Sequence, residues 1–399
     1  MTGLPAAAWR EDPALHRTLE ALTDARFGRP RAVGGAVRDT LAGIAVTDVD
    51  LATPLRPDEV VRRLQAAGLK AVPTGIAHGT VTAVADGKPF EVTTLRRDVA
   101  TDGRRAKVAF ADDWAEDAQR RDFTINAMYA DPVTGELFDP VGGRADLAAG
   151  RVRFIGDAAT RIAEDHLRIM RWFRFDARFG GGEGDPATEA VIAAHARTLR
   201  ALSRERVADE LLRLLALPDP APAVARMARL GVLAEIAGEA MPDGPARLEQ
   251  LVRAEAVAQV EPDALRRLIA LGPADPERAE GLAARLRLST RQRKHIAATL
   301  SASDAMSGRE LAYRNGAGVA RDAALLRGDA TAAAELAAFE PPLFPLRGRD
   351  LIARGVPAGP EVARLLKQIE AAWIAKGFPG SDGTAALVDA ALGQAATAR

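Results

Sequence analysis

The chain has no cysteine among its 399 residues, and only 5% of its residues are aromatic. The lack of cysteine excludes a disulfide framework and every metal site that is built from cysteine ligands. No apolar run approaches the roughly 20 residues that a helix needs to cross a bilayer. Residues 1–12 also lack the basic and then apolar layout of a signal peptide. These absences predict a cytoplasmic protein without a membrane segment.

Neither sign of charge is in excess, because 54 lysines and arginines face 54 aspartates and glutamates. A domain that binds nucleic acid usually carries a basic surplus, so this balance counts mildly against a polyanionic partner. Net charge is only a sum, however, and binding depends on where the charges lie. The length of the chain and its 48% apolar content predict a mostly helical protein of two to four domains.

The most informative stretch covers residues 30–53. An apolar segment leads into Gly34 and Gly35, and a helix-compatible run over residues 36–41 follows. Glycines leave backbone N–H groups uncovered at a helix start, where a phosphate binds against the amides and the positive end of the helix dipole. Arg38 lies about one turn into this helix and can reach the same anion. The sequence therefore predicts a phosphate-binding turn.

Two acids follow this turn, with Asp48 and Asp50 alternating with apolar Val49 and Leu51. In an extended strand, residues two apart point the same way, so we expect both carboxylates on one face. Two carboxylates beside a phosphate cradle suit Mg²⁺ ions that bridge a nucleoside triphosphate. Taken singly, a Gly-Gly is usually a turn and an Asp-x-Asp is usually two solvated acids. Their order and spacing make the combination far more specific.

Apolar periodicity predicts helices over residues 13–28 and 57–68, two short strands within 71–84 and a strand over 89–95. The last of these strands carries Glu91, which by default is a half-exposed strand acid. Residues 96–110 are polar and basic, and Asp102-Gly103 marks a turn, so we interpret them as a solvated loop.

A long helix is predicted over residues 161–175, which contain no proline or glycine and repeat apolar residues at helical spacing. Asp165 and Arg168 lie three apart and should neighbour each other on its surface. Arg171 and Arg174 each lie nearly another turn along. An isolated Glu-Asp-x-x-Arg pattern is most simply an acid–arginine pair on a wet helix face.

Five motifs occur together in this chain: Gly34-Gly35, Asp48-x-Asp50, residues 120–128, residues 139–143 and the Glu-Asp-x-x-Arg pattern at 164–168. In this order they resemble the nucleotidyltransferase superfamily, in the branch that holds class II tRNA CCA-adding enzymes and bacterial poly(A) polymerases. The resemblance is strong over about residues 30–215 and weak elsewhere. It implies an α/β N-terminal head with a mixed sheet, followed by an all-α neck, body and tail. We expect the head at residues 1–155, the neck at 156–216, the body at 217–300 and the tail at 301–399.

The resemblance implies a catalytic centre in which Asp48 and Asp50 hold two Mg²⁺ ions, with Glu91 as a candidate third carboxylate. Metal-assisted transfer would join the nucleotide to the RNA 3′-hydroxyl and release pyrophosphate. It also implies that the triphosphate is bound by Gly34, Gly35, Arg38 and Arg121.

The resemblance further implies that Asp122 accepts a hydrogen bond from the ribose, because an ionised carboxylate only accepts. Asp165 and Arg168 would select the base. Cytosine and adenine both carry an amino donor next to a ring acceptor, whereas uracil presents carbonyls there. Arg171 and Arg174 would lie nearer the triphosphate.

The function that the resemblance implies is the addition of CCA to tRNA 3′ ends from CTP and ATP, with tRNA contacts from the tail. A poly(A) polymerase shares every motif, although those enzymes often carry a long basic C-terminal extension. A CC-only or A-only enzyme is a further alternative, and the basic segment after Leu95 argues weakly against the CC-only form. A non-catalytic RNA-binding scaffold is the alternative from another class. The sequence predicts no oligomeric state.

Overall fold

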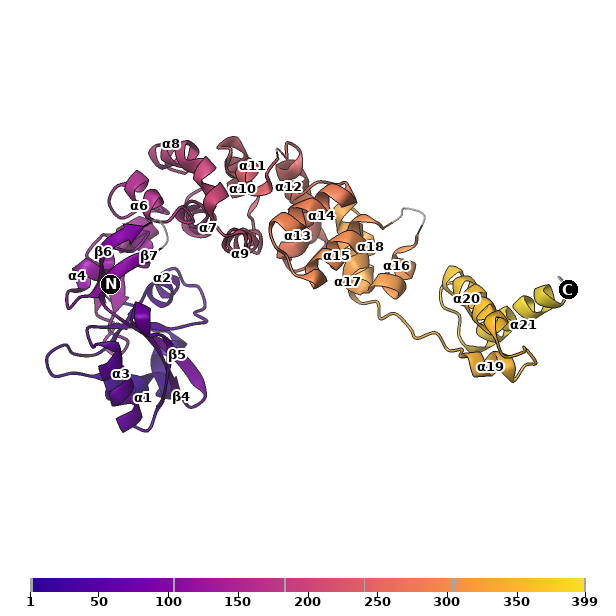
Figure 1. Cartoon of the computed structure of the whole chain (residues 1–399), viewed down its shortest axis with the longest axis horizontal. Helices are drawn as coiled ribbons and strands as arrows, with labels where there is room; N and C mark the ends of the chain where they lie inside the picture. Colours follow the sequence, from indigo (N-terminus) through magenta and orange to yellow (C-terminus); the bar gives the residue numbers. More distant parts are fainter. Residues whose placement is uncertain (1–2, 103–104, 183, 240, 303–305, 398–399) are drawn as a thin grey trace. The chain divides into compact units, whose positions relative to one another are not determined.

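The computed structural model describes residues 3–102, 105–182, 184–239, 241–302 and 306–397. The chain forms two compact units, Met1–Ala240 and Met241–Arg399, and each is considered by itself (Figure 1). Within the described ranges, no helix is long and apolar enough to cross a membrane.

The first unit is built on a seven-stranded sheet in the order β3-β4-β5-β2-β1-β8-β9. In chain order its strands are β1 (Arg31–Val33), β2 (Asp50–Thr53), β3 (Lys70–Gly75), β4 (Thr80–Ala85), β5 (Lys88–Thr94), β8 (Tyr129–Ala130) and β9 (Leu137–Phe138). Strands β2 and β5 are parallel, and the other neighbours pair antiparallel. The mixed sheet that the resemblance implied is therefore confirmed.

Helices α1 (Pro13–Leu22) and α3 (Pro57–Ala66) pack against each other and against β4 (Figure 1). Alternate residues of β4 are buried, as expected for a strand with one face on a core. Helix α1 ends at Leu22, six residues before its predicted end. The Asp24 carboxylate accepts hydrogen bonds from the backbone N–H groups of Arg26 and Phe27, at 2.8 and 3.1 Å. This local turn replaces further helix.

The segment predicted as a solvated loop is a two-stranded sheet of β6 (Arg96–Asp102) and β7 (Arg105–Phe110). The backbone N–H of Ala111 donates to the carbonyl of Leu95 at 2.8 Å, so the ends of the segment are joined. Pairing between the ends satisfies backbone groups that a loop would leave to water. The loop interpretation is therefore wrong for the paired residues. Gly103 of the predicted turn lies outside the described residues.

Three short helical segments lie between the sheet and the helices that follow it. They are α4 (Trp114–Gln119) and η3 (Thr124–Asn126), before β8 in the chain, and α5 (Gly143–Ala148), after β9. A Cβ on Gly143 would lie 2.1 Å from the carbonyl oxygen of Thr124, so only glycine fits there. The carboxylate of Asp139 accepts from the N–H groups of Gly143 and Arg144, at 2.8 and 2.9 Å. These contacts fix the start of α5.

The helices that complete the first unit are α6 (Ala158–Glu164), α7 (Arg168–Phe179), α8 (Pro186–His195), η4 (Ala196–Ala201), α9 (Arg204–Leu215), α10 (Ala221–Arg229) and α11 (Val232–Ala237). The single helix predicted over residues 161–175 is wrong, because α6 ends before Asp165 and α7 begins after it. Asp165 has an extended backbone, with φ −151°. Its carboxylate accepts from the N–H of Leu167 at 3.1 Å and so competes with the helix for that amide.

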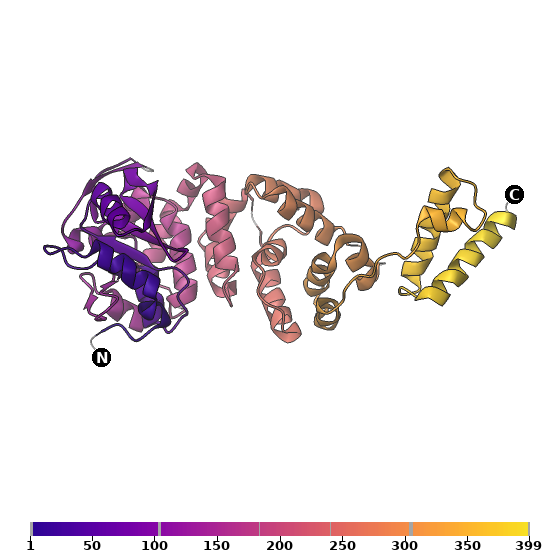
Figure 2. The ribbon, with the colours of Figure 1, turned by 90° about the horizontal axis from the view of Figure 1, so that it is seen from below.

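The second unit is helical throughout its described parts, as the resemblance implied (Figure 2). Its helices are α12 (Gly244–Ala258), α13 (Ala264–Leu271), α14 (Pro276–Arg285), α15 (Thr290–Leu300), α16 (Gly308–Asn315), α17 (Ala317–Leu326), α18 (Ala330–Ala337), α19 (Gly348–Ile352), α20 (Pro360–Ala375) and α21 (Ser381–Thr397). Apolar residues form one core around α17 and another around α20. Beside the first core, the buried Arg266 bonds to Glu255 at 2.7 Å and to Asp322 at 3.0 Å.

Candidate active site

The glycine turn joins β1 to α2 (Gly35–Leu41). Gly34 adopts φ +64° and ψ −115°, a conformation that strains residues with a side chain. No side chain caps α2, so the N–H groups of its first turn are free of a side-chain acceptor. A Cβ on Gly34 would lie 3.8 Å from Nη1 of Arg121. The structure thus brings the Gly34 and Gly35 turn together with Arg121, an arrangement suited to an anion.

The predicted carboxylates lie along the edge where β2 begins. Asp50 is the first residue of β2, and its partner in the parallel register with β5 is Glu91. Asp48 lies two residues before the strand, so the prediction that one strand carries both aspartates is wrong. Asp48, Asp50 and Glu91 are all exposed.

The charges at this edge act on one another. Desolvation by surrounding protein raises the pKa of Asp50, and the negative charges of Glu91 and Asp48 raise it further, while Arg121 opposes the shift. Asp48, Asp50, Glu91 and Arg121 therefore share one electrostatic neighbourhood.

The fit of a divalent cation can be judged from these donors. Within the described ranges, no group of three or more histidine, cysteine, aspartate or glutamate side chains is close enough to hold a metal ion. The three carboxylates therefore do not form a complete protein cage. Mg²⁺ usually binds through one or two carboxylates and keeps several waters. A bound cation would offset both the desolvation and the negative charges that raise the pKa of Asp50, so the pair Asp48 and Asp50 fits Mg²⁺.

Arg121 is held by a buried group that sequence reasoning missed. The Asp117 carboxylate accepts from Arg120 at 2.6 Å, from Arg121 at 3.0 Å and from the Tyr129 hydroxyl at 2.6 Å. Burial raises the pKa of the Asp117 carboxyl, but Arg121, Arg120 and Tyr129 outweigh it and hold this pKa at about 2. The contact between Asp117 and Arg121 could have been predicted from their spacing, because oppositely charged residues four apart can pair on one face of a helix.

Asp122 lies next to Arg121 and binds both η3 and α7. Its Oδ1 accepts from Asn126 Nδ2 at 3.1 Å, and its Oδ2 accepts from Arg171 Nε at 2.7 Å. Burial raises the pKa of Asp122, but Arg171 and Asn126 outweigh burial and leave this pKa below its usual value. Asp122 is therefore an ionised acceptor, as its predicted role requires.

Arg38 differs from its expected position. The side chain is buried, donates from Nε to Asp39 at 2.8 Å and from Nη1 to Asn126 at 2.5 Å. Its guanidinium also lies over the rings of Phe175 and Phe179, 5.0 and 4.4 Å from their centroids. These contacts tie α2 to α7. The predicted contact between Arg38 and a triphosphate therefore stays a prediction, and its buried partners favour a structural role.

The side chains of Asp165 and Arg168 bind other partners, although the backbone N–H of Arg168 donates to the carbonyl of Asp165 at 3.0 Å. Asp165 Oδ2 accepts from Arg206 Nη2 at 2.8 Å. Arg168 Nη1 donates to the carbonyl of Arg161 at 2.9 Å and forms an ion pair with Glu164. The side-chain neighbours expected from a continuous helix are separated because Asp165 lies in the break between α6 and α7.

Arg174, the last of the predicted residues, donates to Glu210 at 2.7 Å. Arg206 and Glu210 belong to α9, and sequence reasoning gave neither of them a role in the site. No local spacing could have identified them, because they lie 36 or more residues away from their partners.

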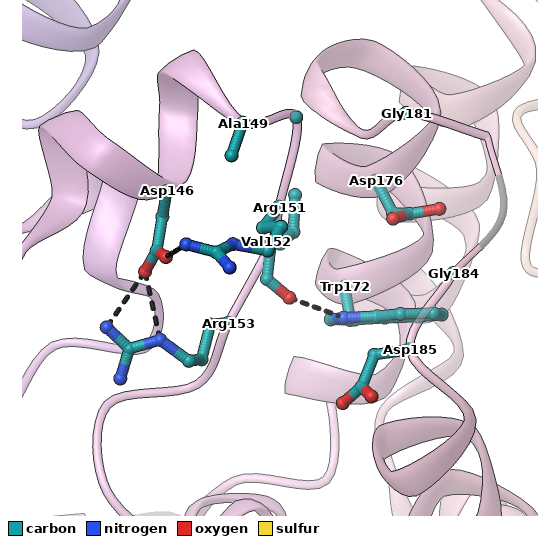
Figure 3. A pocket seen from close by; sticks show the side chains of 11 residues that line it. Asp146, Ala149, Arg151, Val152, Arg153, Trp172, Asp176, Gly181, Gly184 and Asp185 are labelled. Carbon is teal, nitrogen blue, oxygen red and sulfur yellow. Dashed lines mark hydrogen bonds and ion pairs between the residues drawn. The ribbon is translucent and has the colours of Figure 1, made fainter.

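A cavity of about 630 Å³ lies elsewhere in this unit, between the chain after α5 and helix α7 (Figure 3). Trp172 Nε1 donates to the carbonyl of Val152 at 3.0 Å, and Asp146 forms ion pairs with Arg151 and Arg153 (Figure 3). None of the predicted site residues lines this cavity. The cavity therefore adds no residue to the candidate site.

Comparisons with known proteins show which proteins this chain is similar to. Family models described as "Poly A polymerase head domain" and "Probable RNA and SrmB- binding site of polymerase A" match residues 30–153 and 185–241. The mouse mitochondrial CCA tRNA nucleotidyltransferase 1 is 35% identical over 367 residues, which are 87% of this chain and 83% of that protein. The CCA-adding enzyme of Geobacillus stearothermophilus is 40% identical over 223 residues, 55% of this chain and 54% of that protein.

A solved structure is similar over nearly the whole chain. It is the Bacillus stearothermophilus CCA-adding enzyme in complex with CTP, which has a TM-score of 0.76 and 27% identity. The likeness covers 97% of this chain and 100% of that one.

Proposed function

The chain belongs to the family of CCA-adding tRNA nucleotidyltransferases, and we propose that it adds cytidine, cytidine and adenosine to the 3′ end of tRNA from CTP and ATP. One observation carries this proposal: the uncapped Gly34 turn, Arg121 and the carboxylates of Asp48 and Asp50 lie in one neighbourhood. This set combines an anion site with a cation site, as a metal-bound nucleoside triphosphate requires.

Asp48 and Asp50 would hold Mg²⁺, which when bound activates the RNA 3′-hydroxyl and neutralises the leaving pyrophosphate. The Gly34–Gly35 turn binds the triphosphate through the amide of Gly35, together with the guanidinium of Arg121, because the Gly34 amide already donates to the carbonyl of Met128 at 3.3 Å. Asp117 holds Arg121 before the substrate arrives, so no reorganisation is needed in the transition state. Glu91 lies beside Asp50 and would act through the charge of that carboxylate.

Asp122 binds the ribose hydroxyl with the Oδ2 lone pair that Arg171 leaves open, because Oδ1 already accepts from Asn126 and from the N–H of Phe123. Asp165 accepts from the amino group of cytosine or adenine, and Arg168 donates to the neighbouring ring acceptor. Because Arg168 is paired with Glu164, it must exchange that partner for the base. Arg171 and Arg174 would face the triphosphate side of the nucleotide.

The division into head, neck, body and tail is part of the proposal, with base reading in residues 156–216 and tRNA contacts in residues 301–399. The cytoplasmic location stays a prediction, because two similar proteins, of mouse and human, are named as mitochondrial. A poly(A) polymerase is the second candidate, since the family model over residues 30–153 bears that name.

The test is incubation of the whole chain with CTP, ATP, Mg²⁺ and a tRNA transcript that lacks CCA. We expect three added nucleotides, each with release of pyrophosphate. The variant Asp48→Ala should incorporate nothing yet bind CTP with largely unchanged affinity. Full activity in that variant would remove the metal assignment. Failure of the wild-type chain to add any nucleotide would favour an RNA-binding scaffold.

A further inference from the structure

The cavity beside α7 (Figure 3) is lined by charged side chains that the candidate active site does not use. It lies between residues 149–153 and the segment that runs from α7 to the start of α8. Its volume of about 630 Å³ is typical of small-molecule sites, which span about 300–1,000 Å³. The N–H of Gly181 donates to the carbonyl of Gly150 at 2.8 Å and joins the two sides at one rim. The cavity therefore has the size and the defined rim of a ligand site.

Two arginines give the cavity a positively charged side. Arg151 Nη2 and Arg153 Nε approach the same carboxylate, that of Asp146, at 3.2 and 2.9 Å. Asp146 also accepts from the hydroxyl of Thr124 at 2.7 Å. Because one carboxylate neutralises only one guanidinium group, this side keeps a surplus positive charge.

The surplus charge is open to a ligand. The Asp146 side chain is only 4% exposed, whereas those of Arg151 and Arg153 are 65% and 56% exposed. Each guanidinium carries five N–H donors, and contacts among the described residues occupy only some of them. Arginine binds phosphate oxygens through two parallel hydrogen bonds. The two arginines therefore suit a phosphate group.

The other side of the cavity carries acceptors. Figure 3 shows Asp176 and Asp185 on the side of α7 and α8, with the Trp172 ring between them. Trp172 Nε1 is already bonded to the carbonyl of Val152, so the ring offers the cavity an apolar edge. Asp176 pairs with Arg226, and Asp185 accepts from two N–H groups at the start of α8. An ionised carboxylate has about four acceptor sites, so both carboxylates can accept from a further amino group.

The cavity lies on a different face of α7 from the side chains of the candidate active site. Trp172 and Asp176 are four residues apart and share one face. Arg174 is two residues from each of them, which places it about 200° away around the helix. A ligand in the cavity therefore binds behind α7, away from the predicted triphosphate site.

We propose that this cavity binds a nucleoside monophosphate whose base carries an amino group, as CMP and AMP do. Arg151 and Arg153 bind the phosphate, and the carboxylates of Asp176 and Asp185 accept from the amino group. The ligand joins residues 149–153 to α7 and holds the rim closed. This inference goes beyond the proposed function and does not rest on it, because none of the predicted site residues lines the cavity.

The experiment measures hydrogen exchange of the Gly181 amide in the whole chain with CMP, AMP, UMP or inorganic phosphate. This amide reports on the cavity because its hydrogen bond to Gly150 closes the rim, and neither glycine belongs to the candidate active site. CMP and AMP should slow its exchange. UMP should need about tenfold more ligand for the same effect, since it lacks the donor for a charged hydrogen bond. Inorganic phosphate should protect the amide far less at equal concentration.

Variants of the two sides separate their roles. Arg151→Ala should weaken CMP about tenfold, the effect of one charged hydrogen bond, and Arg151→Lys should restore part of the affinity. Asp185→Asn keeps the cap of α8, because asparagine caps as well as aspartate, and should lower the preference for CMP over UMP about fivefold. Arg213→Ala is the matched control, because Arg213 is similarly exposed, at 60%, and lies outside the cavity. It should change neither quantity.

Two results would overturn the proposal. If CMP leaves exchange of the Gly181 amide unchanged, or protects it equally in Arg151→Ala and Arg213→Ala, no mononucleotide binds in the cavity. If inorganic phosphate protects the amide as strongly as CMP does, the base makes no contact and the assignment of a nucleotide is wrong. Neither result bears on nucleotide addition to tRNA, which is measured separately by extension of the transcript.

Discussion

The carboxylate of Asp117 should stabilise the head and the triphosphate site together, and Asp117→Asn tests this. The side chain is 1% exposed and lies within hydrogen-bonding distance of Arg120, Arg121 and Tyr129. Its pKa of about 2 lies below the usual value of an aspartate carboxyl, about 3.9. At about 1.4 kcal/mol for each pKa unit, the ionised form contributes about 2 kcal/mol to stability. Removing one partner of a buried ion pair costs about 3–5 kcal/mol.

We therefore expect Asp117→Asn to lower the local free energy of unfolding by about 2–4 kcal/mol at pH 7. Hydrogen exchange of the β1 and β8 amides measures this local free energy of unfolding. These strands report on Asp117 because Tyr129, whose hydroxyl donates to Asp117, lies in β8, and β8 pairs with β1. KM for CTP should rise as well, since Arg121 loses an anchor beside Gly34. Asp113→Asn is the matched control, because Asp113 caps the same helix α4 from an exposed position and asparagine caps equally well.

The pH dependence follows from the sign of the shift. A carboxyl whose pKa is lowered on folding contributes stability that is present above its unfolded pKa and is lost as pH falls through its folded pKa. The difference between wild type and Asp117→Asn should therefore hold above about pH 5 and shrink as pH falls toward 2. An Asp117→Asn chain that matches Asp113→Asn to within about 0.5 kcal/mol at pH 7 would refute this reasoning.

Two further predictions concern Arg38 and Asp50. Arg38→Ala should cost about 2–4 kcal/mol of stability, because it removes a buried ion pair and the contacts with Phe175 and Phe179. KM for CTP should change less than about threefold. Unchanged thermal stability with a large rise in KM would instead assign Arg38 to the triphosphate. Asp50→Asn should raise the melting temperature at pH 7 without Mg²⁺, because desolvation, and then the charges of Glu91 and Asp48, raise the pKa of Asp50 and make its ionised form unfavourable in the folded chain. An unchanged or lower melting temperature would contradict this penalty on the ionised carboxylate.

Local sequence patterns predicted the elements that position the glycine turn. The helix after Gly34 and the strand that carries Glu91 occur where they were predicted, and the apolar segment before Gly34 forms β1. The turn at Gly34 could be predicted because glycine adopts positive φ readily, whereas phosphate binding by this turn stays a prediction. The parallel pairing of β2 with β5 was not predicted, because no local pattern specifies strand order and the resemblance implied only a mixed sheet.

The side-chain partners could not be predicted in the same way. Apolar periodicity cannot detect that the Asp165 carboxylate binds the Leu167 amide, and that bond breaks the helix expected over residues 161–175. The pairing of Asp165 with Arg206 spans 41 residues, so it depends on how α9 packs against α7. Arg38 illustrates the same limit, because the aromatic rings that cover it come from α7.

The most direct test of the central claim uses three tRNA transcripts that end before the first C, the second C and the A, each supplied with one nucleoside triphosphate at a time. We predict that CTP extends the first transcript by two nucleotides and the second by one, that ATP extends only the third, and that UTP and GTP extend none. A long run of adenosine, or extension that stops at CC whatever is supplied, would contradict the account.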